Sequence, residues 1–298
     1  MKRNAIVRII LWSIVLLVLL ALFFALLYVP GGNFLKREDT PKASMVPVPI
    51  TEQHDNSQFH MNIVKVDPSQ IREIEIEWAA GSIVIQPADT DELSFREEDI
   101  GGSGKPMHWK IQRDSILIQY AEDGTFPIKF GTDWKNENKN LIIEVPVTWQ
   151  FDSLKVAAAV ASLEVKDVNI REMEFDGASG SCVFDNCIVE KLDLDTASGN
   201  VRFTGSLQQL ECDAASADIV LELTNVPRSL DMNTASGDLD VTLPADAGFT
   251  VTLDTLSGDF ESDFDTTMRG GSYVAGNGHC RIDVDAMSGD VIIRKNTK

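Results

Sequence analysis

The chain has 298 residues, with 46 Asp and Glu against 26 Lys and Arg, a formal net charge of −20 and four cysteines. This length can hold one or two domains with a sizeable core. The negative charge argues against a nucleic-acid partner, because binding to a phosphate backbone depends on Lys and Arg that displace counterions.

Residues 9–29 form an uninterrupted apolar segment, IILWSIVLLVLLALFFALLYV. At ~1.5 Å per residue these 21 residues cross a hydrocarbon layer of ~30 Å. A cleaved signal peptide is the alternative, but its apolar region is normally ~7–15 residues long. Lys2, Arg3 and Arg8 precede the segment, which favours a cytoplasmic N-terminus. We therefore expect a cytoplasmic tail at 1–8, one transmembrane helix at 9–29 and an extracytoplasmic body.

Residues 30–60 combine prolines with polar residues and show no periodicity, which is typical of an extracytoplasmic linker. Beyond them the sequence alternates as strands do, for example in IREIEIEW at 71–78 and LIIEVPV at 141–147. No stretch after the anchor has a convincing helical period. The domain at 61–298 is therefore predicted to be all-β.

A short phrase recurs in this domain as GASGSC, TASGNV, AASADI, TASGDL, TLSGDF and AMSGDV, with its serines 19, 18, 20, 21 and 31 residues apart. When positions are counted from the serine, apolar residues lie at even positions before it and at odd positions after it. The alternation of inward and outward residues therefore changes parity at the Ser-Gly pair. In a strand this change requires a bulge or corner, for which glycine is suited. Weaker copies place Ser162 and Ala80 at the serine position. The predicted corner residues are Ser179, Gly180, Ser198, Gly199, Ser216, Ser236, Gly237, Ser257, Gly258, Ser288 and Gly289.

A strand, a corner and a second strand, repeated every 20 residues or so, predict a single-stranded right-handed β-solenoid (a β-helix). Stacking is needed because no single rung can bury its apolar side alone. The alternative, a β-sandwich of hairpins, would show turns every 8–12 residues. The spacing leaves room for some eleven rungs between Ile74 and Ile293.

The outward positions of the repeats are mostly acidic, and stacking would place like charges ~5 Å apart, where they repel by roughly 1 kcal/mol in water. Three interpretations stay open: hydrogen bonding at the corners with a solvated face, calcium between the rungs, or a cationic partner. No other cofactor is expected. The carboxylates that would hold calcium are Asp176, Asp195, Asp213, Asp218, Asp238, Asp254, Asp259, Asp285 and Asp290.

No catalytic residues are predicted. The phrase GASGSC lacks the second glycine of a GxSxG nucleophile elbow, and the four histidines show no paired spacing. Acids recur in every rung, whereas a catalytic pair would be a local exception. The long last interval is rich in glycine and suggests a contact loop with Arg269, Tyr273 and His279.

The four cysteines have no zinc-ligand spacing. Cys182 and Cys212 fall on the predicted inward face, so we expect buried free thiols. A disulfide is the alternative in an oxidising compartment.

The succession of T-A-S-G-D units, which ends in GNGHCRIDVDAMSGDVIIRK, resembles the bacterial family of putative adhesins known as domain of unknown function 4097. The likeness covers about residues 62–295, although AASAD at 214–218 lacks the glycine and the last interval is long. The resemblance implies a β-solenoid at the bacterial cell surface, often behind one membrane anchor. It implies a binding or structural role and no catalytic residues.

We therefore expect a single-pass protein of the bacterial cell membrane that acts as a surface adhesin or envelope scaffold. Its partners would be the membrane and another envelope protein or a cell-surface ligand. An accessory protein of envelope-stress signalling is the alternative, which some relatives suggest. A polysaccharide-active enzyme is a third and weaker hypothesis.

Overall fold

The computed structural model describes residues 63–121 and 138–297. Within these ranges no helix is long and apolar enough to cross a membrane. The expected tail, anchor and linker at 1–60 lie outside the described residues. One short 3-10 helix, η1 (Pro68–Gln70), is present. The strands are β1 (Val64–Val66), β2 (Glu73–Ala88), β3 (Leu93–Asp99), β4 (His108–Gln112), β5 (Ser115–Gln119), β6 (Lys139–Pro146), β7 (Gln150–Lys166), β8 (Asn169–Ser179), β9 (Cys182–Ser198), β10 (Val201–Ser216), β11 (Ile219–Leu223), β12 (Ser229–Ser236), β13 (Leu239–Leu243), β14 (Phe249–Ser257), β15 (Phe260–Ser262), β16 (Thr267–Arg269), β17 (Ser272–Ala275), β18 (Cys280–Ser288) and β19 (Val291–Lys295).

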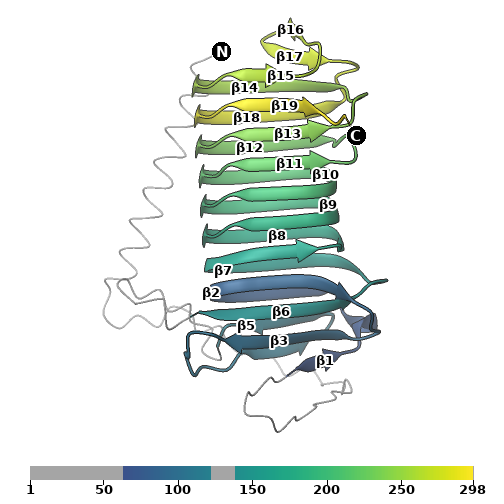
Figure 1. The fold of residues 1–298 in the computed structure, drawn as a ribbon, viewed down its shortest axis with the longest axis vertical. Coiled ribbons are helices and arrows are strands. Elements are labelled where there is room, and N and C mark those ends of the chain that lie inside the picture. Colours follow the sequence, from purple (N-terminus) through teal and green to yellow (C-terminus); the bar gives the residue numbers. More distant parts are fainter. Residues whose placement is uncertain (1–62, 122–137, 298) are drawn as a thin grey trace, which may run out of the picture. The chain divides into compact units, whose positions relative to one another are not determined.

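Most strands pair in parallel and in register, and they form a stack of rungs (Figure 1). Each rung has a first arm before the Ser-Gly corner and a second arm after it. In the first arms Ser216 pairs with both Ser198 and Ser236, and in the second arms Val201 pairs with Cys182 and Ile219. We call the stacked first arms the first layer and the stacked second arms the second layer. The predicted all-β solenoid is confirmed, while its right hand stays a prediction.

The core lies between the two layers. Leu194, Cys212 and Met232 follow one another up the first layer, and Phe184 and Phe203 do so in the second. All five are at most 1% exposed and belong to one hydrophobic cluster. Each rung thus buries its apolar side chains against its neighbours and against the facing layer, which stabilises the stack by ~25 cal/mol per Å² of apolar surface removed from water.

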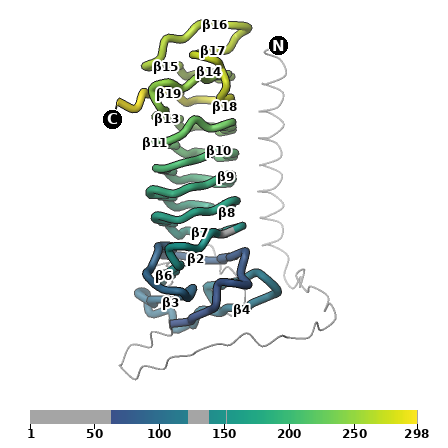
Figure 2. Tube along the Cα trace, turned by 90° about the vertical axis from the view of Figure 1, so that its right-hand side faces the viewer, coloured from purple at the N-terminus to yellow at the C-terminus, as the bar shows by residue number. Residues whose placement is uncertain are grey.

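The long strands β9 and β10 each run through the second arm of one rung and the first arm of the next. They turn from one layer to the other at Asn186 and Gly205, which have φ of 52° and 129°. The side-chain amide of Asn186 donates a 2.6 Å hydrogen bond to the carboxylate of Asp167 in the preceding rung. This return corner closes the repeat of about 20 residues (Figure 2).

The rungs near the C-terminus are not stacked in chain order. The C-terminal rung, β18 and β19, lies between the rung of β12 and β13 and the rung of β14 and β15. In Figure 1 the yellow strands β18 and β19 accordingly lie between green ones. After β13 the chain skips one rung position and forms β14 and β15 one position further along. It then forms the hairpin of β16 and β17 and returns, so that β18 and β19 fill the skipped position.

The segment between β13 and β14 passes close to the segment between β17 and β18 at Gly248. A Cβ there would lie 2.0 Å from the side-chain oxygen of Asn277. The carbonyl of Gly248 also accepts a 3.0 Å hydrogen bond from the N–H of Cys280. Glycine is needed at this point because two backbones approach closely.

The other end of the stack repeats this arrangement. Strand β2, the first long strand, lies between β7 on one side and β5 and β6 on the other. Antiparallel strands then cover the ends: β3 and β1 beyond β6, β4 beyond β5, and β17 and β16 beyond β14. Such strands protect the stack from pairing with other chains.

Two details of the predicted repeat are wrong. The described residues form nine rungs rather than eleven, because much of the segment between β2 and β7 forms antiparallel strands. The serine position in β7 is occupied by Val160, which pairs with Ala80, whereas Ser162 pairs with Ser82. The predicted serine position of this copy, Ser162, is therefore two residues beyond the true one, Val160. A shift of two residues leaves the inward and outward faces unchanged but misplaces the corner.

Candidate binding surface

The outward side chains of the first layer form two columns of carboxylates, because successive rungs pair in register. We call this surface the acidic face. The outer column contains Glu174, Asp193, Glu211, Asp231 and Asp283, and the inner column contains Asp176, Asp195, Asp213, Asp285 and Asp254. Asn233 interrupts the inner column between Asp213 and Asp285.

Asp176, Asp195 and Asp213 occupy three adjacent rungs of the inner column, and none of the described cations forms an ion pair with them. Partial desolvation raises the pKa of Asp176, and the charge of Asp193 raises it further. The pKa of Asp195 is raised by desolvation first, and then by its neighbours Asp176 and Asp213. The carboxylate of Asp213 accepts a 2.8 Å hydrogen bond from the side-chain amide of Asn233, but no described cation pairs with any of the three charges.

In the outer column, Asp193, Glu211, Asp231 and Asp283 are paired with two cations. Lys191 lies 3.0 Å from Asp193 and 3.2 Å from Glu211, measured between Nζ and the nearest carboxylate oxygens. The hydrogen bond with Asp193 is the main cause that raises the pKa of Lys191. Arg281 lies 2.9 Å from Asp231 and 3.4 Å from Asp283.

A shallow groove of about 450 Å³ lies between these two cations. Its lining residues are Lys191, Gln209, Leu210, Glu211, Ser229, Asp231, Asn233 and Arg281. Lys191, Gln209, Ser229 and Arg281 follow one another on four successive rungs. Sequence reasoning singled out the acids of this surface but missed these four residues, since they share no residue type.

The predicted corner residues lie where the two layers meet. Gly237 has φ of +150°, and a Cβ on it would lie 1.9 Å from the carbonyl oxygen of Ala217 in the preceding rung. Gly289 needs no unusual φ, but its Cβ would lie 2.1 Å from the carbonyl oxygen of Gly237. The threonine of the repeated phrase caps the corner: the hydroxyl of Thr234 donates to the carbonyl of Ser236 at 2.9 Å.

The aspartates that follow the corners form a ladder. The carboxylate of Asp218 accepts the N–H of Asp238, that of Asp238 accepts the N–H of Asp290, and that of Asp290 accepts the N–H of Asp259, at 2.8–3.1 Å. Calcium at these residues and at the inner column stays a prediction. Among the described residues no three or more Asp, Glu, His or Cys side chains are grouped as a metal site.

The predicted contact loop is a hairpin. Its strand β17 pairs antiparallel with β14, and Tyr273 stacks on Phe260 with ring centroids 4.2 Å apart. Arg269 and His279 are exposed. Tyr273 is thus engaged in packing at the end of the stack, and only the other two side chains are exposed for contact.

All four cysteines are buried, free thiols. Burial raises the pKa of Cys182, Cys212 and Cys280 to about 12 and that of Cys187 to about 11. The thiolate is the reactive form, so these side chains act as small apolar core residues.

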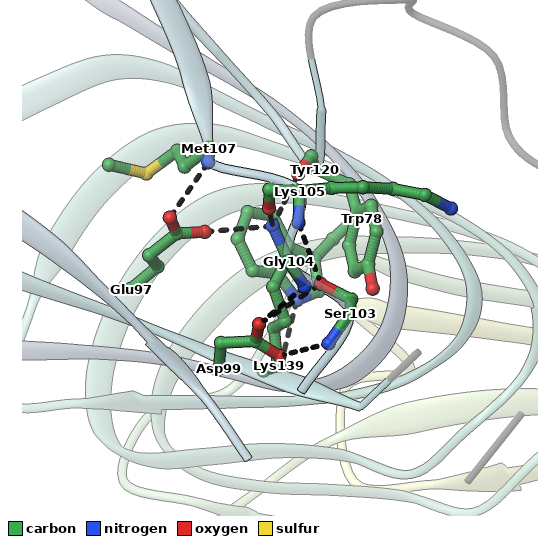
Figure 3. A network of polar contacts seen from close by, with 9 residues as sticks. All are labelled: Trp78, Glu97, Asp99, Ser103, Gly104, Lys105, Met107, Tyr120 and Lys139. Carbon is green, nitrogen blue, oxygen red and sulfur yellow. Dashed lines mark hydrogen bonds and ion pairs between the residues drawn. The ribbon is translucent and has the colours of Figure 1, made fainter. Parts of the chain in front are cut away.

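One buried charge was missed from the sequence. Lys139 is fully buried, and its Nζ lies 2.7 Å from Glu97 and 2.9 Å from the carbonyl oxygen of Lys105 (Figure 3). The same Nζ lies 4.0 Å from the ring centroid of Tyr120 and 5.1 Å from that of Trp78. The indole N–H of Trp78 in turn donates to the carbonyl of Lys139 at 3.0 Å.

The loop that follows β3 covers this lysine. The carboxylate of Asp99 accepts the N–H groups of Ser103 and Gly104, both at 2.9 Å, and this turn brings the Lys105 carbonyl onto Lys139 (Figure 3). The signal was present in the sequence, since Lys139 continues the inward alternation of Leu141 and Ile143. We interpret the network as a structural element that holds the end strands together.

Comparisons with known proteins give one family and several distant structures. The sequence model of the Toastrack family, DUF4097, matches residues 71–294. A putative cell adhesion protein from Clostridium sporogenes ATCC 15579 is 11% identical, with a TM-score of 0.39, and the match covers 80% of this chain and 100% of that one. A putative adhesin from Bacteroides fragilis NCTC 9343 is 12% identical, with a TM-score of 0.40 and coverage of 80% and 98%. A comparison with curated proteins gives no match.

Proposed function

The chain belongs to the Toastrack DUF4097 family, and from this premise we propose that it is a non-catalytic binding protein of the bacterial cell surface. In this proposal residues 9–29 anchor the chain in the cell membrane, residues 30–60 act as a linker, and the solenoid lies outside the cytoplasm. The solenoid then serves as an adhesin or scaffold.

We propose that the partner is cationic. The observation that supports this is the run of Asp176, Asp195 and Asp213, which stacks three carboxylates on adjacent rungs. Desolvation first, and then repulsion by Asp176 and Asp213, raise the pKa of Asp195, and a cation bound there would relieve the repulsion. Binding energy and association rate would both gain from the aligned charges, and both would fall as salt screens them.

A binding role also agrees better with the repeated chemistry than catalysis does. Acids recur from rung to rung, and the corner aspartates are engaged in hydrogen bonds with backbone N–H groups. A catalytic carboxylate pair would need two acids in contrasting environments.

The test is a titration of the purified full chain in detergent with a decamer of lysine and a decamer of glutamate. We expect the lysine decamer to bind, with an affinity that falls as salt is raised, and the glutamate decamer not to bind. The triple variant Asp176→Asn, Asp195→Asn, Asp213→Asn should weaken binding strongly.

The matched control removes three carboxylates elsewhere, with Asp89→Asn, Asp91→Asn and Asp114→Asn. These side chains are exposed and lie outside the acidic face. Equal weakening by the two triple variants would show that only net charge matters, and would contradict a binding site on the acidic face.

A further inference from the structure

The groove between Lys191 and Arg281 differs in kind from the uncompensated run of aspartates. One terminal nitrogen of Arg281 donates to both carboxylate oxygens of Asp231, at 2.9 and 3.0 Å. At the other end Lys191 bridges Asp193 and Glu211. Glu211 and Asp231, the two carboxylates that line the groove, are therefore each paired with a cation, and charge-assisted hydrogen bonds of this kind are directional.

The inserted C-terminal rung creates one end of this groove. Arg281 pairs with Ser229 on one side and with Thr250 on the other. If the rungs were stacked in chain order, Thr250 would lie beside Ser229 and the groove would have no cation at that end. The same order would bring Glu261 beside Asp240, since both now flank Ile292. The insertion avoids that repulsion and places a guanidinium in the groove.

Donors and acceptors line the groove in two adjacent columns. Lys191, Gln209, Ser229 and Arg281 present N–H and O–H donors along one column. Glu211 and Asp231 present carboxylate acceptors along the next column. The short side chain of Ser229 makes the hollow, because longer side chains stand on both sides of it.

A sugar hydroxyl suits such a surface because it donates one hydrogen bond and accepts two. A simple cation or anion suits it less, since the charged side chains that line the groove are already paired with one another. We infer that this groove binds a neutral saccharide chain, lying across the rungs. This second site goes beyond the cationic partner proposed above, and it uses other residues.

The test is a titration of the full chain in detergent with neutral tetrasaccharides of glucose, galactose, mannose and N-acetylglucosamine, followed by saturation-transfer NMR. Tetragalacturonate serves as the anionic probe of the same length. We expect saturable binding of at least one neutral tetrasaccharide and weaker binding of the anionic one.

Two variants locate the binding. Ser229→Trp fills the hollow, and Arg281→Thr introduces the residue type that chain-order stacking would place there. Each should weaken neutral tetrasaccharide binding by about tenfold or more, which corresponds to ~1.4 kcal/mol. The matched control is Ser153→Trp, on the same outward column two rungs before Lys191, which should leave binding unchanged.

Absence of binding by all four neutral tetrasaccharides would overturn the inference. So would equal weakening by Ser229→Trp and Ser153→Trp. Neither result would affect the lysine decamer, whose binding depends on Asp176, Asp195 and Asp213, so the two proposals can fail separately.

Discussion

The backbone N–H of Asp290 donates a 2.8 Å hydrogen bond to the carboxylate of Asp238, a residue 52 positions earlier in the chain. Asp259 is nearer to Asp238 in sequence but lies one rung further away, and its N–H donates to the carboxylate of Asp290 instead. The hydrogen bonds between the corner aspartates therefore follow the order of the rungs in the stack and not their order in the sequence. They also link the rung of β18 and β19 to the rung of β12 and β13.

Engineered disulfides should report this order directly. Asp231 pairs in register with Asp283, and Thr252 lies one rung beyond Asp283. We expect Asp231→Cys with Asp283→Cys to form a disulfide, because adjacent parallel strands meet the Cα separation of ~4.4–6.8 Å that a disulfide requires. The pair Asp231→Cys with Thr252→Cys, two rungs apart, should not. Peptide mapping by mass spectrometry would identify the bond, and the opposite preference would show chain-order stacking.

Corner glycines should be far less tolerant than exposed ones. Gly237→Ala must place a Cβ 1.9 Å from a backbone carbonyl at φ of +150°, whereas Gly270→Ala meets open space at φ of +59°. We expect Gly237→Ala to lower the free energy of unfolding by at least ~2 kcal/mol, and Gly270→Ala by only about 1–2 kcal/mol. Thermal melting of the two variants side by side provides the comparison. Equal costs would mean that the corner relaxes readily.

Removal of the buried lysine should be costly. Lys139→Met would leave Glu97 without its ion pair and the carbonyl of Lys105 without its donor. We expect a loss of ~3–5 kcal/mol, the usual cost of breaking a buried pair from one side. Adding Glu97→Gln should restore part of it. Lys110→Met, at an exposed lysine of β4, is the control and should cost little. If Lys139→Met left the free energy of unfolding unchanged, a structural role for the network would be excluded.

Stability should depend on pH through the inner column. The folded-state pKa of Asp195 lies above its ordinary value of 3.8, so the folded state binds this proton more tightly than the unfolded chain does. Ionised Asp195 therefore destabilises the fold above its folded-state pKa, and the penalty is absent below the ordinary value. We expect Asp195→Asn to raise the melting temperature slightly at pH 7 and to leave it unchanged at pH 3. A lower melting temperature at pH 7 would indicate that the charge is stabilised by an opposite one.

The local features of the fold could be predicted from the sequence. Alternation that changes parity at Ser-Gly gives both arms of a rung, their inward residues and the corner between them. The burial of Cys182 and Cys212 follows from the same pattern. The outward acids of both columns follow too, because outward positions are simply those that alternation leaves out of the core.

The order of the rungs could not be predicted, because every rung presents the same pattern of inward apolar residues. Met232 could pack against Leu253 as well as against Val284, which occupies that place. The choice depends on contacts between distant segments, such as Arg281 with Asp231, and on the close approach of two segments at Gly248. The groove was missed for the same reason. Lys139 was missed because alternation is used to find buried apolar residues, and a lysine at an inward position is not expected to be buried.

The most direct test of the central claim is binding of a fluorescent lysine decamer to intact cells that carry the full chain. Cells with the unaltered chain should bind more of it than cells without the chain, and the variant Asp176→Asn, Asp195→Asn, Asp213→Asn should lose that excess. The variant Asp89→Asn, Asp91→Asn, Asp114→Asn should keep it at equal expression. No excess binding by the unaltered chain, or equal loss in both variants, would contradict a surface protein that binds a cationic partner through its acidic face.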